Sequence, residues 1–191
     1  MRKTTVAKHL LALVALILPL YCGAVTVNDV EMPDTYAWEG KELKLMGAGT
    51  RSKWFMDLYV AGLYLTEASG NAKAILEADE PQRIALHITS GMITSERMTD
   101  AVLEGFETST GGNTAPIQAD IDRFIGVFDE PIKEGDEFSL MYVPGKGVNV
   151  LKNGKYQDTV GDLAFKQALF GIWLADTPVD EDLKAELLGQ R

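Results

Sequence analysis

The chain has 191 residues, and 28 acidic against 18 basic side chains give it a net charge of −10 at neutral pH. Its hydrophobic fraction of 46% suits one globular domain with a sizeable core. So acidic a chain is a poor partner for nucleic acid or for an anionic membrane, and neither is expected to bind it.

The first 24 residues are typical of a secretory signal peptide. Arg2, Lys3 and Lys8 precede the apolar run LLALVALILPLY, which is too short to span a bilayer comfortably, and small residues follow it. We expect cleavage after Ala24, leaving one domain over residues 25–191 in a bacterial periplasm with no stable membrane insertion. An uncleaved membrane anchor is the alternative. Cleavage would remove the only cysteine, Cys22, and therefore any disulfide.

The segments that follow are mostly strands. VTVNDVEMP (25–33) has the β-branched character of a first strand, KELKLMGAGTR (41–51) predicts a second that ends in a tight glycine turn, and KWFMDLYVAGLYLTE (53–67) predicts a long third. NAKAILEAD (71–79) indicates a short helix. QRIALHITS (82–90) then alternates, which places Ile84, Leu86 and Ile88 on one face and Arg83, Ala85 and His87 on the other. A strand of this kind fits an antiparallel sheet that is covered on one side.

The second half of the chain alternates helices and strands. Apolar residues at helical spacing predict helices over TSERMTDAVLEGFETST (94–110) and APIQADIDRFIGVFDEP (115–131). Turn signals at Pro144-Gly145 and Asn153-Gly154 divide residues 136–160 into a three-stranded meander. Residues 162–176 and 180–190 predict two closing helices. The fold class that follows is α+β, with helices packed on one face of an antiparallel sheet.

Several kinds of chemistry lack the residues they need. Once the expected leader is removed, His87 is the only histidine and no cysteine remains, which argues against a zinc site and a Cys-His pair. GAGTR and GKG are better explained as turns than as phosphate-binding loops, and the acidic clusters lack the spacing of a calcium loop. We therefore expect neither a metal nor a cofactor, and we interpret His87 as structural.

Five segments together resemble the chalcone isomerase-like family, in its bacterial exported branch. They are GAGTR (47–51), YVAGLYL (59–65), ERMTDAVLEGF (96–106), VPGKGVNVLKNGK (143–155) and ALFGIWLADTPVDEDLK (168–184). The resemblance spans residues 26–189. It implies an open-faced β-sandwich, in which a large antiparallel sheet carries a layer of helices on one face and a ligand cleft lies between them.

The resemblance also sorts this chain between two functional kinds. Arg51 matches the arginine that true chalcone isomerases share with the fatty-acid-binding members. Tyr59 falls where the enzymes have a threonine and the fatty-acid binders a tyrosine. Residues 91–106 contain neither the tyrosine nor the asparagine of the enzymes, and Ile172 stands about where their late hydroxyl would be. The resemblance therefore implies a binding protein in which Arg51 and Tyr59 hold a carboxylate.

The chemistry of these two residues suits that role. A guanidinium offers a planar fork of donors that matches a carboxylate, and in an apolar cleft it requires an anion. We expect Arg51 to face such a cleft with no acidic side chain beside it; pairing with Asp57 or another acid is the alternative. The predicted ligand-binding residues are Arg51, Tyr59, Phe55, Met98, Val102 and Phe106. Arg97 is either a second anion contact or part of a solvated helix face.

Three functions stay open at this stage. The first is a periplasmic, non-catalytic binding protein for a small amphipathic acid such as a fatty acid. The second is an isomerase of the intramolecular lyase type, in which Arg51 and Tyr59 stabilise developing negative charge and Tyr59 or His87 serves as the base. The third is a structural module whose cleft is filled by side chains. The oligomeric state is left open.

Overall fold

The computed structural model describes residues 23–191, so the expected leader lies outside the described residues except for its last two positions. Seven antiparallel strands form one sheet in which every neighbour in space is also a neighbour in sequence. The strands are β3 (Thr35–Trp38), β4 (Lys41–Lys53), β5 (Met56–Leu65), β6 (Gln82–Ile88), β7 (Glu137–Val143), β8 (Gly147–Lys152) and β9 (Lys155–Val160). A separate hairpin is made by β1 (Ala24–Val27) and β2 (Val30–Pro33).

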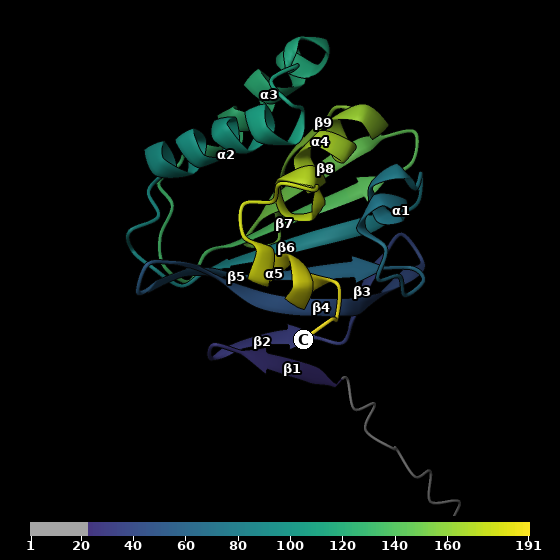
Figure 1. Cartoon of the computed structure of the whole chain (residues 1–191), viewed down its shortest axis with the longest axis vertical. Helices are drawn as coiled ribbons and strands as arrows, with labels where there is room; N and C mark the ends of the chain where they lie inside the picture. Colours follow the sequence, from purple (N-terminus) through teal and green to yellow (C-terminus); the bar gives the residue numbers. More distant parts are fainter. Residues whose placement is uncertain (1–22) are drawn as a thin grey trace, which may run out of the picture.

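The helices lie on one side of this sheet and the β1–β2 hairpin lies on the other (Figure 1). They are α1 (Ala72–Glu77), α2 (Ser95–Ser109), α3 (Gln118–Ile125), α4 (Leu163–Leu174) and α5 (Glu181–Leu187), with short 3₁₀ turns at Ala115–Ile117 and Gly126–Phe128. This arrangement confirms the predicted α+β class and the open-faced β-sandwich. Within residues 23–191, no helix combines the length and the apolar character needed to cross a membrane.

Strand β6 shows why the two faces differ. Ile84, Leu86 and Ile88 are buried in the main core under the helices, as their alternation predicts. Ala85 points to the opposite face and joins a second, smaller apolar cluster. Its neighbour Arg83 is also buried there, where it donates a hydrogen bond to Ser139 Oγ at 2.7 Å. The prediction of one covered face is therefore incomplete, because Met32 of β2 and the aromatic side chains of β3 also shield part of the other face.

The glycine segment 47–49 is not a turn, as the sequence suggested, but the middle of β4. A Cβ atom on Gly47 would lie 2.1 Å from the carbonyl oxygen of Glu186, and one on Gly49 would lie 1.9 Å from its carboxylate. Glycine in a strand commonly marks a close approach of another backbone. The segment therefore lets α5 rest directly on β4. The true turn lies further on, at residues 54 and 55.

Two further differences concern short strands. Residues 25–33 form two strands rather than one, because Asn28 and Asp29 adopt positive φ angles of 47° and 62° and reverse the chain. Strand β3 was not predicted, since its four residues TYAW give too short a period to recognise. The predicted meander of residues 136–160 is confirmed, with Asn153 and Gly154 in the turn between β8 and β9.

Candidate functional site

A cavity of about 370 Å³ lies between the sheet and the helices. Strands β5, β6 and β7 line it with Leu58, Tyr59, Leu86, Phe138 and Leu140; α2 contributes Met98, Ala101, Val102 and Gly105, and α4 contributes Leu169, Ile172 and Trp173. Phe124 and Phe128 line it from α3 and the 3₁₀ turn that follows. Most of this lining is apolar, and the volume falls within the range of small-molecule sites.

The polar lining residues are mostly at the mouth. Arg51 and Lys53 come from the end of β4, Arg97 and Glu104 from α2, and Thr177 from the loop between α4 and α5. Three cations and one acid thus line the cavity of a chain that carries a net negative charge. The local charge favours an anionic group at the mouth.

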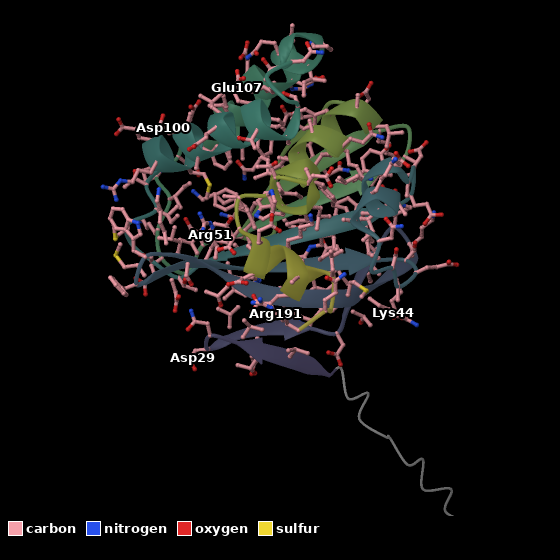
Figure 2. The ribbon with its side chains drawn as sticks, in the orientation of Figure 1. Asp29, Lys44, Arg51, Asp100, Glu107 and Arg191 are labelled. Carbon is pink, nitrogen blue, oxygen red and sulfur yellow. The ribbon has the colours of Figure 1, made fainter. Side chains whose placement is uncertain are left out.

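Arg51 and Tyr59 stand directly opposite each other on β4 and β5. Directly opposed residues of antiparallel strands project to the same face of the sheet, so both side chains reach the cavity. Figure 2 shows Arg51 in the layer between the sheet and α2. The sequence predicted that these two residues share one cleft, and the strand register brings them together.

Arg51 has an acidic neighbour, contrary to the expectation of an unneutralised guanidinium. Its Nη1 atom donates to Asp180 Oδ2 at 2.9 Å and also to the carbonyl oxygen of Ser52. Arg51 and Asp180 each keep 17% of their side-chain surface exposed. Asp57, the partner that the sequence suggested, accepts hydrogen bonds from Ser52 and Asn28 instead. Among the described residues, Nε and Nη2 of Arg51 have no hydrogen-bond partner, so they are available to a second anion.

Tyr59 is buried and receives a hydrogen bond from the indole of Trp173, with 3.0 Å between Nε1 and the hydroxyl oxygen. Burial raises the pKa of Tyr59 from 10.0 to about 12, which outweighs the lowering effects of the Trp173 hydrogen bond and of the Arg51 charge. The phenol therefore stays protonated at neutral pH. Because its oxygen accepts from Trp173, its own hydrogen can be donated to a ligand.

The other predicted site residues divide into two groups. Met98 and Val102 line the cavity, whereas Phe106 belongs to an aromatic cluster behind it, with ring centroids 5.5 Å from Phe165 and 6.2 Å from Phe124. Phe55 does not line the cavity either. It is fully exposed at the tip of the β4–β5 hairpin, because the register of β4 and β5 leaves it in a two-residue turn rather than inside the strand.

Two further residues bear on the chemistry of the site. His87 alternates with Leu86 and Ile88, so it lies on the face of β6 that points away from the cavity, and burial lowers its pKa. Asp180 was missed by the sequence analysis. It could be recognised as the cap of a helix, but its pairing with Arg51 joins positions 129 residues apart. Within residues 23–191, no group of His, Cys, Asp and Glu side chains is arranged to hold a metal ion.

The comparisons with known proteins concern the family and the fold of this chain. The sequence model described as chalcone isomerase-like matches residues 24–189. The chain belongs to the chalcone isomerase-like family. A search of curated protein sequences finds no match. Among solved structures, a fatty-acid-binding protein from Arabidopsis thaliana is similar, with a TM-score of 0.69, 16% sequence identity, and coverage of 87% of this chain and 96% of the other.

These findings confirm the family and the fold that the five segments suggested. At 16% identity, the likeness to the Arabidopsis protein concerns the fold. The likeness extends over nearly all of that protein and over most of this chalcone isomerase-like chain.

Proposed function

We propose that this chalcone isomerase-like protein is exported to the periplasm and binds an acyl acid without converting it. The observation that carries the proposal is the cavity of about 370 Å³ that Arg51, the opposed residue Tyr59 and many apolar side chains line together. The Arabidopsis neighbour with the same fold is a fatty-acid-binding protein, which supports this class of ligand. The leader-like residues 1–24 support export.

The head of the ligand is a carboxylate at the mouth. Nε and Nη2 of Arg51 donate to it, and the Tyr59 hydroxyl donates to the same oxygens. Hydrogen bonds to charged groups contribute about 1.5–3 kcal/mol each. Asp180 keeps the guanidinium in place but also competes with the ligand for it. The carboxylate therefore sets the orientation of the ligand and adds less affinity than it would gain from a guanidinium without an acidic partner.

The tail supplies most of the affinity. A methylene group occupies roughly the volume of a water molecule in the liquid, about 30 Å³, so 370 Å³ accommodates about a dozen carbon atoms. Each buried methylene contributes on the order of 0.8 kcal/mol. A medium-length chain is the best match, and its methyl end lies against Phe124, Phe128 and Phe138.

Catalysis of the isomerase type has no support from the two bases that the sequence suggested. Tyr59 has a pKa of about 12 and is not ionised at neutral pH. His87 lies on the other face of the sheet. A chalcone absorbance assay is expected to give no turnover above background, and measurable turnover that requires Arg51 would replace the binding proposal with the enzyme.

The proposal is tested by native mass spectrometry of the protein purified from the periplasm. We expect an acyl acid of about a dozen carbons to accompany the wild type, and the mass of the chain to show a start at Val25. Arg51→Met is expected to lose the ligand while remaining folded. Arg123→Met is the matched control, because Arg123 is ion-paired with Asp158 outside the cavity. Loss of the fold in Arg51→Met, or a wild type that never carries an acyl acid, would contradict the proposal.

A cavity-filling variant tests the contribution of the ligand's tail separately from that of its carboxylate. Val102→Trp places an indole in the space where the tail would lie, and it is expected to weaken binding of twelve-carbon acids about tenfold or more while the free energy of unfolding changes little. Should twelve-carbon acids bind this variant as tightly as the wild type, the ligand lies elsewhere.

A further inference from the structure

The hairpin between β4 and β5 ends in two aromatic side chains that are almost fully exposed. Trp54 is 84% exposed and Phe55 is 101% exposed. No other large apolar side chain in residues 23–191 is as exposed as either of these. Single exposed apolar residues are ordinary, but two adjacent aromatic side chains at a protruding tip form a candidate binding surface.

The backbone conformation of the turn does not explain why these two residues are aromatic. Lys53 and Met56 are paired, so Trp54 and Phe55 form a two-residue turn. Turns of this length favour glycine or asparagine where φ is positive. Trp54 nevertheless has a φ of 60°, which is uncommon for a bulky side chain. Neither the turn nor the core therefore accounts for tryptophan at this position, and such outliers point to a functional requirement.

The tip lies at the same end of the molecule as the cavity mouth. Lys53, directly before the tip, lines the cavity, as does Arg97 at the start of α2. A hydrogen bond of 3.0 Å from Thr89 N to Leu58 O ties the loop before α2 to β5. In this loop Met92 is 40% exposed, and its carbonyl oxygen accepts from Arg97 Nη1 at 3.0 Å. Figure 1 shows the β4–β5 turn at the same end of the molecule as the start of α2.

We propose that this end of the protein docks on the surface of a lipid bilayer. We call it the docking end and define it as Lys53, Trp54, Phe55, Met92 and Arg97. Trp54 and Phe55 enter the interfacial region, where amphipathic aromatic rings are favoured. Lys53 and Arg97 have no ion-pair partner among the described residues, so their charges are available to lipid phosphates.

Local charge selects the kind of bilayer. Asp57 lies just behind the tip and Glu96 lies beside Arg97, and the whole chain carries a charge of −10. A surface rich in anionic lipid would repel the body of the protein, whereas a zwitterionic surface offers phosphates without a net negative potential. The docking end is therefore suited to zwitterionic lipid, and insertion of the aromatic rings provides the driving force rather than long-range attraction.

Docking in this orientation places the cavity mouth against the bilayer. A single-chain amphiphile could then pass between lipid and cavity without crossing bulk water. This consequence rests on the proposed function, whereas the docking itself does not, because the tip residues Trp54 and Phe55 do not line the cavity.

The test is flotation with vesicles of phosphatidylcholine and phosphatidylethanolamine. All variants are purified as the cell produces them, and mass spectrometry establishes that they share one N-terminus. The wild type is expected to float with the vesicles, and the double variant Trp54→Ser/Phe55→Ser to bind at least about tenfold more weakly. Tyr156→Ser is the matched control, because Tyr156 is 60% exposed on β9 and does not line the cavity. It is expected to bind like the wild type.

Brominated lipid in the same vesicles locates the tip. Quenching of tryptophan fluorescence is expected in the wild type and lost in Trp54→Ser, because Trp173 is buried and Trp38 is largely shielded. Because the quenching reports the position of Trp54 itself, it tests the proposal even if an uncleaved leader holds the chain on the vesicle. Absence of quenching in the wild type would overturn the proposal. So would concentration-dependent dimerisation that the double variant abolishes, since the tip would then bind a second copy of this chain.

The proposal of acid binding and the proposal of bilayer docking can be tested independently. Binding of an acyl acid in vesicle-free solution is expected to be unchanged in Trp54→Ser/Phe55→Ser, and Arg51→Met is expected to float like the wild type while losing the acid. Loss of both properties in either variant would show that the docking end and the cavity are not independent sites.

Discussion

Arg51 and Asp180 form an ion pair at the cavity mouth, with 2.9 Å between Nη1 and Oδ2. The same carboxylate caps α5, because its other oxygen accepts from the backbone nitrogens of Asp182 at 2.9 Å and Leu183 at 3.1 Å. One acidic side chain thus fixes the start of a helix and neutralises the cation that a ligand would use. The ion pair orients the guanidinium of Arg51. Any incoming anion therefore has to share this guanidinium with Asp180.

Asp180→Asn is therefore expected to tighten binding of an acyl acid. The amide oxygen can still cap α5, since asparagine caps as well as aspartate, but the negative charge that competes with the ligand is gone. A partly exposed ion pair is worth up to about 1 kcal/mol, so the dissociation constant measured by calorimetry is expected to fall about fivefold. Asp182→Asn is the control, because Asp182 pairs with Arg191 on the surface. Weaker binding in Asp180→Asn alone would mean that Asp180 positions Arg51 more than it competes.

The sequence predicted that Arg51 and Tyr59 lie together, but it did not predict what surrounds them. Arg51 and Tyr59 were recognised because they lie in two short motifs, and the register that opposes them follows from a hairpin between adjacent strands. Asp180 could not be foreseen, because its position depends on how α5 returns to β4 after the whole chain has folded. Phe55 was misplaced because an aromatic residue before an apolar strand is indistinguishable, in a single sequence, from the first residue of that strand.

The protonation state of Tyr59 gives a second prediction. Its pKa of about 12, raised from 10.0 by burial, means that the folded state binds this proton more tightly than the unfolded state. The corresponding stability is fully present below pH 10 and is lost as the pH rises through 12. In a near-ultraviolet absorbance titration, the difference between the wild type and Tyr59→Phe is expected to show no phenolate signal at pH 10. The same difference in denaturant should show one, and ionisation of Tyr59 at pH 10 in the folded protein would disprove the assignment.

Gly47 gives a prediction about packing. Its Cβ position lies 2.1 Å from Glu186 O and 2.8 Å from Leu187 O, which are backbone atoms that cannot rotate away. Gly47→Ala is expected to push α5 from β4 and to lower the free energy of unfolding by about 2 kcal/mol. Gly91→Ala is the matched control, since no heavy atom of residues 23–191 outside its chain neighbours lies within 4 Å of its Cβ position. Equal stability of the two variants in urea would show that α5 does not need this contact.

The same glycine shows where sequence reasoning fails in general. The sequence GAG predicted a turn, because glycine is among the commonest turn residues. In this structure the missing side chains let α5 approach β4, where Thr50 N donates to Glu186 Oε2 at 3.2 Å although the two residues lie 136 positions apart. Periodicity predicts which face of an element is buried, as it did for β6, but it does not show which distant element comes close enough to exclude a methyl group.

Lys166 gives the last prediction, because it is a fully buried cation without an ion-pair partner among the described residues. Its ammonium donates to the carbonyl oxygens of Ile75 at 2.9 Å, Leu76 at 3.0 Å and Ala78 at 2.9 Å. These groups end α1, so one side chain of α4 holds the last turn of a short helix. Lys166→Met removes all three donors and is expected to lower the free energy of unfolding by roughly 3 kcal/mol, whereas Lys146→Met, at an exposed ion pair with Glu39, is expected to have little effect.

The pH dependence of this difference tests the burial of the charge. Burial lowers the pKa of Lys166 from 10.5 to about 8, so the folded state binds this proton more weakly than the unfolded state. The unfolding free energy that Lys166 contributes therefore rises as the pH increases from 8 to 10.5, and it falls as the pH decreases through that window. Tyrosine ionisation occurs in both proteins and cancels in the comparison. In urea unfolding, the gap between the wild type and Lys166→Met should widen over this range, and a gap that narrows would show that the three carbonyl groups hold the charged form more strongly than burial opposes it.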